Sequence, residues 1–63
     1  MVMVSIVGYV EHIKHHTFVI YADHDYYVVR SNKNYQLNEH VTITGTLKSR
    51  IVGDVVTYEI IEA

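Results

Sequence analysis

The 63-residue sequence contains no cysteine and no proline, and it has only three glycines. Without cysteine, neither a disulfide nor a thiolate zinc site can support the fold. A chain this short buries only roughly 60% of the surface that its unfolded form exposes. Tight packing, closure of a sheet or a partner protein must therefore supply the stability.

Positive charge is also scarce, because five Lys and Arg residues face seven Asp and Glu residues, for a net charge of -2. The chain thus lacks the basic excess of an autonomous nucleic-acid-binding protein. Hydrophobic residues make up 49% of the chain and charged residues 19%, a balance that excludes disorder. The apolar start, 1–7, is too short for a membrane span and lacks a basic signal region. We therefore expect a cytoplasmic protein with no membrane attachment.

Apolar and polar residues alternate along most of the chain, as is typical of β-strands. The pattern predicts five strands, at 2–13, 17–22, 26–30, 41–48 and 55–61. Loops are predicted near 12–16, 23–25, 31–40 and 49–54. No segment shows three turns of helical periodicity. Residues 1–63 are therefore expected to form a single all-β domain.

Glycine in the middle of the first strand favours a sharp bend, which lets one strand serve two sheets. Five short β-branched strands also leave reactive edges unless the sheet closes into a barrel. The strand order resembles the oligonucleotide/oligosaccharide-binding (OB) fold, most clearly at Gly8 within 6–10 and in LNEHVTITGTL at 37–47. This resemblance implies a five-stranded OB barrel in which the helix between strands three and four is reduced or absent. An SH3-like barrel is the alternative.

Tyrosines form the first candidate site. Period two places Phe18, Ile20 and Ala22 in the core and sends the intervening side chains outward. The same alternation predicts an exposed patch of Tyr9, Tyr21 and Tyr26 beside Arg30. Strands two and three of OB proteins carry the surface on which bases stack. Tyrosine is also a favoured strand residue, and such a patch equally suits a protein interface.

Basic residues near two loops form the second candidate site. Lys14 lies in the first predicted hairpin loop, and Lys48 and Arg50 lie beside the last one. These are the loops that frame the binding groove of OB proteins. Scattered lysines and arginines on a solvated surface are the alternative interpretation. Four acidic residues near the same loops oppose phosphate binding, so we expect weak single-strand binding by the chain alone: Glu11, Asp23, Asp25 and Asp54.

Metal binding and catalysis find little support. His12, His15 and His16 straddle a loop, where their spacing does not make them converge on an ion. The chain has no cysteine nucleophile, no serine in a nucleophile-elbow motif and no glycine-rich phosphate loop. We predict a non-enzymatic protein with no catalytic residue, no metal and no cofactor.

Several apolar side chains are expected to point outward, which predicts a covering partner: Val19, Val28, Val55 and Ile61. The proline-free composition, rich in Asn, Lys, His, Ile and Tyr, is typical of low-GC bacteria and their mobile elements. In size and style the chain is similar to small single-strand-binding or primase-accessory proteins of staphylococcal cassette elements. That resemblance implies an accessory subunit of DNA replication that binds a primase or polymerase and guides single-stranded DNA. A free-standing single-strand-binding protein, an SH3-like peptide-binding module and a homodimer are the alternatives.

Overall fold

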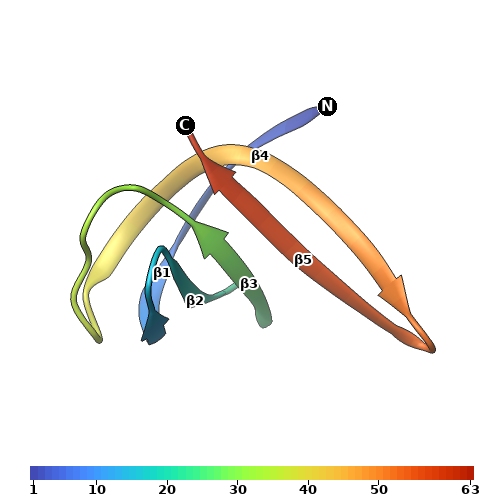
Figure 1. The fold of residues 1–63 in the computed structure, drawn as a ribbon, viewed down its shortest axis with the longest axis horizontal. Coiled ribbons are helices and arrows are strands. Elements are labelled where there is room, and N and C mark those ends of the chain that lie inside the picture. The colour runs from blue at the N-terminus through green and yellow to red at the C-terminus, as the bar shows by residue number, and fades with distance from the viewer.

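A computed structural model describes all residues, 1–63, and contains five strands and no helix (Figure 1). The strands are β1 (Val2–Lys14), β2 (Thr17–Ala22), β3 (Asp25–Arg30), β4 (His40–Val52) and β5 (Val55–Glu62). The predicted all-β class is confirmed. No helix is present that has the length and hydropathy to cross a membrane.

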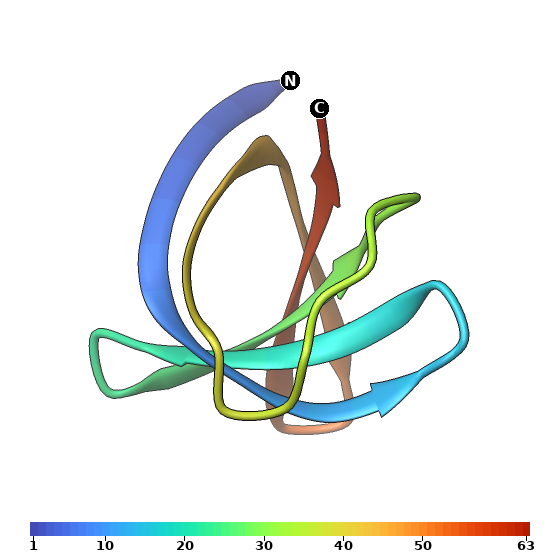
Figure 2. The same cartoon turned by 90° about the vertical axis from the view of Figure 1, so that its left-hand side faces the viewer.

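The five strands close into one barrel in the order β1-β2-β3-β5-β4, with β4 returning to pair with β1 (Figure 2). Every neighbouring pair is antiparallel except β3 and β5, which run parallel. This architecture confirms the OB-like barrel. The connector 31–39 contains bends and a turn but no helix, as its short length predicts.

Two long strands each pair with two neighbours, and a glycine lies where each strand changes partner. β1 pairs with β4 from Val2 to Tyr9 and with β2 from Tyr9 onward, so Gly8 lies at the change. A Cβ at Gly8 would collide with the backbone carbonyl of Tyr21. At Gly45 in β4, a Cβ would collide with the carbonyl of Ile61. The barrel therefore needs glycine at these positions because neighbouring backbone passes too close for a side chain.

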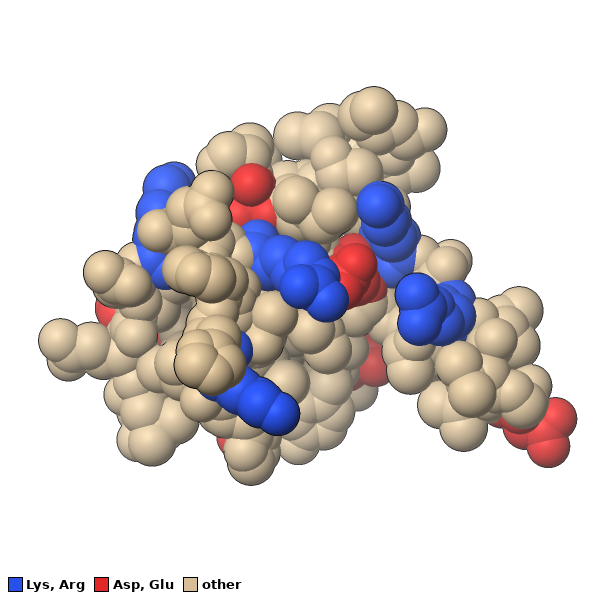
Figure 3. All heavy atoms as spheres, in the orientation of Figure 1, with Lys and Arg blue, Asp and Glu red and all other residues tan.

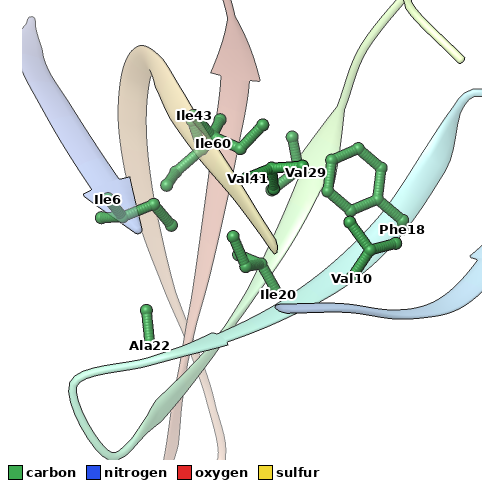
Figure 4. Packing of buried hydrophobic residues seen from close by; sticks show 9 residues of the cluster. All are labelled: Ile6, Val10, Phe18, Ile20, Ala22, Val29, Val41, Ile43 and Ile60. Carbon is green, nitrogen blue, oxygen red and sulfur yellow. The ribbon is translucent and has the colours of Figure 1, made fainter. Parts of the chain in front are cut away.

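The core lies inside the barrel and consists of nine buried apolar side chains that point toward one another (Figure 4). They include the predicted inward set on β2, Phe18, Ile20 and Ala22. Tyr35 from the connector packs its ring on Phe18, with ring centroids 5.0 Å apart. The remaining members come from β1, β3, β4 and β5: Ile6, Val10, Val29, Val41, Ile43 and Ile60.

The last hairpin is longer than the sequence pattern predicts. β4 runs on to Val52, so the predicted loop at 49–54 is wrong except at Gly53 and Asp54, which form the turn. Gly53 has a φ of 62°, the conformation that a tight hairpin turn requires at this position. Because β4 and β5 keep pairing beyond their contacts with other strands, the hairpin extends away from the barrel (Figure 1).

The first hairpin also differs at its loop. β1 continues through Lys14, and the predicted loop 12–16 shrinks to a turn at His15 and His16. The register with β2 shifts between Glu11 and Lys14, where His12 has a φ of 52°. Such a bulge absorbs an extra residue without ending the strand, which explains why polar residues here are compatible with a strand.

We predict that Gly8→Ala destabilises the barrel by about 1–3 kcal/mol, because the new methyl group forces β1 away from β2. Urea unfolding measures the change. Val7→Ala is the matched control, since Val7 is exposed on the same strand and its truncation should change stability by less than about 0.5 kcal/mol. Equal unfolding midpoints for the two variants would contradict this account of Gly8.

Candidate nucleic-acid interface

Four exposed aromatic side chains form a continuous row across four strands on the outside of the barrel. The register pairs His40 of β4 with Tyr9 of β1, Tyr9 with Tyr21 of β2, and Tyr21 with Tyr26 of β3. Tyr9 stacks on His40 at 4.7 Å between ring centroids and an interplanar angle of 26°. Tyr21 and Tyr26 lie 4.8 Å apart. We call these four residues the aromatic row.

The row arises because side chains alternate between the inner and outer faces of each strand. Val10 and Ile20, which neighbour Tyr9 and Tyr21 in sequence, are fully buried and therefore send both tyrosines outward. The prediction that Tyr9, Tyr21 and Tyr26 form one exposed patch is thus confirmed in its geometry. The sequence pattern does not identify His40 as part of the patch, because only the pairing of β1 with β4 brings it beside Tyr9.

Basic side chains converge in a separate groove on the outer side of β3, β5 and β4. The groove, of about 270 Å³, is lined by Arg30, Lys48 and Arg50, three of the five cations in the chain. Glu59 lies among them and accepts a hydrogen bond from Nε of Arg30 at 3.0 Å. Basic side chains spread over this side of the molecule, with acidic ones among them (Figure 3). We call this the basic groove.

Arg30 is not beside the tyrosines, which corrects the sequence prediction. Tyr26 and Arg30 share the outer face of β3 but lie near its opposite ends, about 13 Å apart along the strand. Val28 lies between them on the same face and lines the basic groove. The aromatic row and the basic groove are therefore adjacent surfaces that meet along β3.

Lys14 lies outside the basic groove but at the same end of the barrel. It pairs with Thr17, whose other neighbour is Arg30. Lys14, Lys48 and Arg50 form no ion pair within the chain. These three cations are therefore free to meet phosphate oxygens.

Acidic residues flank the far end of the aromatic row. Asp23 and Asp25 lie at the turn between β2 and β3, next to Tyr26. Together with burial, which is the largest cause, their negative charge raises the pKa of Tyr27. Phosphates are consequently disfavoured at this end, and a nucleic-acid backbone fits better toward the basic groove.

A buried carboxylate holds the connector against the last strand, a feature that the sequence pattern did not reveal. The Glu62 side chain is only 6% exposed. It accepts hydrogen bonds from the hydroxyls of Ser31 and Tyr35 and lies 3.6 Å from Nζ of Lys33. Burial, followed by this hydrogen bond and the carboxylate charge, raises the pKa of Tyr35 to about 12. These contacts join residues far apart in sequence, so no local sequence motif predicts them.

No three or more His, Asp or Glu side chains group so as to hold a metal ion. The three histidines of the first hairpin are exposed at its end. No protein-family model, curated protein or solved structure matches this chain. The interpretation of the aromatic row and the basic groove therefore depends on their own chemistry.

We predict that Tyr35→Phe lowers stability by about 1–3 kcal/mol, because it removes a donor from the buried Glu62 carboxylate. Tyr9→Phe, at an exposed position, is the control. The pH dependence gives a second readout. Because folding raises the pKa of Tyr35 from 10.0 to about 12, its contribution is complete below pH 10 and is lost as pH rises toward 12.

Urea unfolding across this alkaline range measures both effects. The stability of the unmodified chain should fall more steeply with pH than that of Tyr35→Phe, whereas Tyr9→Phe should follow the unmodified chain. A Tyr35→Phe variant as stable as the unmodified chain, with the same alkaline slope, would mean that the Glu62 contacts contribute nothing.

Proposed function

We propose that the chain is a non-catalytic OB-fold accessory protein of DNA replication that guides single-stranded DNA across β1, β2 and β3. The observation that carries this proposal is the aromatic row, which crosses the strands that bear bases in OB proteins. Stacking on aromatic side chains contributes about 1–3 kcal/mol per base and tolerates any sequence. We therefore assign no sequence preference.

The rings of the aromatic row are already ordered by one another. Tyr21 packs on Tyr26, and Tyr9 on His40, before any base arrives. Ordering a flexible side chain at an interface costs about 0.5–1.5 kcal/mol. Rings that are already positioned in the free protein avoid part of this cost. They therefore bind bases more tightly than flexible side chains of the same types would.

Electrostatics limit what the chain does alone. Arg30 is partly neutralised by Glu59, so Lys14, Lys48 and Arg50 are the cations left for phosphates. Because the chain has a net charge of -2 and only a few cations to contact phosphates, we expect it to bind single-stranded DNA weakly and with a strong dependence on salt. In the proposed complex a larger replication protein, a primase or polymerase, supplies the remaining positive charge and the catalytic site.

Exposed apolar residues support a protein partner. The start of the chain exposes Met1, Val2 and Met3, and Val7 is exposed further along β1. Met3 and Val7 share the outer face of β1, with Ser5 between them, and exposed apolar side chains grouped on one face are typical of a surface that a protein partner covers. The assignment of the partner to DNA replication derives from the resemblance to primase-accessory proteins in size and composition.

Single-strand binding is tested by fluorescence anisotropy with labelled oligo-dT at increasing salt. We expect weak binding that falls as salt rises. Tyr21→Ala should lower the affinity by about tenfold, the equivalent of one lost stacking contact. Val7→Ala, which changes an exposed side chain outside the aromatic row, should bind as the unmodified chain does.

The basic groove is tested in the same assay. Lys48→Ala combined with Arg50→Ala should reduce the slope of log affinity against log salt by about 1.4, the value for two lost phosphate contacts on a single strand. Lys33→Ala removes a cation that already pairs with Glu62, so its slope should change less. Absence of oligo-dT binding at low salt would refute direct DNA contact by the free chain.

The accessory role requires a separate measurement. An affinity-tagged copy expressed in its native host should retain a primase or polymerase at near-equal stoichiometry, identified by mass spectrometry. Recovery of the chain without any replication protein would contradict the accessory role. It would not affect the oligo-dT measurement, which uses the chain alone.

A further inference from the structure

Five histidines lie on the surface of this short chain, and one of them belongs to the aromatic row. Histidine is the side chain whose charge ordinarily changes between about pH 5 and 8. No histidine side chain forms a hydrogen bond or an ion pair within the chain. All five are exposed: His12, His15, His16, His24 and His40.

Turn geometry accounts for the four histidines outside the row. His12, His15 and His24 have φ angles of 52°, 42° and 65°. Histidine, asparagine and aspartate are enriched among the non-glycine residues that adopt this left-handed conformation. His16 shares the first hairpin turn with His15. None of these reasons applies to His40, which begins the regular ladder of β4.

The ring of His40 is held by Tyr9 while its nitrogens remain free. The two rings lie 4.7 Å apart between centroids and 26° from parallel, so they touch through their faces. The nitrogens lie on the edge of the imidazole, which such a stack leaves accessible. A protonated imidazole donates from both nitrogens, and a cation is attracted to the face of a tyrosine ring. His40 can therefore donate to a phosphate oxygen without leaving the row.

The groups around His40 include two carboxylates. From β1 come Tyr9 and Glu11, which follow each other on the outer face of the strand. From the connector comes Glu39, the residue before His40. His12 lies next to Glu11, where β1 faces the connector. Carboxylates ordinarily titrate near pH 4 and tyrosines near pH 10, so the histidines are the groups whose charge changes in mild acid.

Both ends of the aromatic row are acidic when His40 is neutral. Asp23 and Asp25 flank Tyr26 at one end, and the carboxylates of Glu11 and Glu39 lie at the other. None of the five lysines and arginines belongs to the row. Protonation of His40 therefore introduces the only positive charge within it.

We propose that His40 is a proton-dependent phosphate contact of the single-strand site, so that the chain binds DNA more tightly in mild acid than at pH 8. This inference rests on the proposed function, because it assigns a charge that holds the strand at the β4 end of the aromatic row. The neutral ring leaves Glu11 and Glu39 to repel phosphates there. The protonated ring adds a fourth cation to the three that have no ion pair within the chain: Lys14, Lys48 and Arg50.

Counterion release gives the size of the effect. One phosphate contact on a single strand changes the slope of log affinity against log salt by about 0.7. His40 should therefore make the slope steeper by about 0.7 at pH 5.5 than at pH 8. A tenfold lowering of salt then strengthens binding about fivefold more at the lower pH. Other histidines add to this change wherever they meet phosphate, so substitution of His40 isolates its share.

Fluorescence anisotropy with labelled oligo-dT, measured against salt at pH 5.5 and pH 8, tests the inference. Thymine and phosphodiester groups do not titrate in this range, so the pH dependence belongs to the protein. His40→Phe keeps a ring on Tyr9 but cannot gain a proton. It should match the unmodified chain at pH 8 and lose about 0.7 of the slope at pH 5.5.

Two further variants control for charge and for position. His40→Lys carries a positive charge at both pH values, so its affinity at pH 8 should approach that of the unmodified chain at pH 5.5. His24→Asn removes a histidine from the turn beside Tyr26 and keeps a residue that tolerates the left-handed conformation. It should retain the pH dependence of the unmodified chain.

Proton NMR of the imidazole signals gives a readout that does not depend on affinity. By linkage, DNA that prefers the protonated ring must hold the proton of His40 to a higher pH in the complex than in the free chain. The signal of His40 is the one that His40→Phe lacks. The titration of His24 should be the same with and without oligo-dT.

Two outcomes would overturn the inference and leave the proposed function standing. One is oligo-dT binding with the same affinity and salt slope at pH 5.5 and pH 8. The other is a His40→Phe variant with the full pH dependence of the unmodified chain. Absence of oligo-dT binding at every pH would overturn the inference together with direct DNA contact.

Discussion

Close backbone approach at two glycines is the constraint on which this barrel depends. β1 and β4 must each change neighbours partway along, and at both positions an adjacent carbonyl occupies the space of a Cβ. The change of partner closes the sheet, and closure leaves few free edges on a chain with only nine core side chains. The aromatic row is a consequence, because Tyr9 follows Gly8 and pairs with strands on both sides.

The connector shows how so short a chain dispenses with the helix that usually spans this position in OB proteins. Tyr35 places its ring on Phe18 and its hydroxyl on Glu62, so one side chain joins the core to a buried polar contact. A buried carboxylate is costly unless it is hydrogen-bonded and paired. Ser31, Tyr35 and Lys33 meet this requirement together, which keeps the connector against β5.

Period-two alternation predicted the number of strands, the inward set on β2 and the three grouped tyrosines, since each depends on local direction along one strand. It failed for the relation between Tyr26 and Arg30, because sharing a face does not place residues at the same end of a strand. It also failed for β4, where Ser49 and Arg50 resemble a turn but continue the ladder to Val52. His40 and Glu62 acquire their contacts through strand pairing, to which a single sequence gives no direct access.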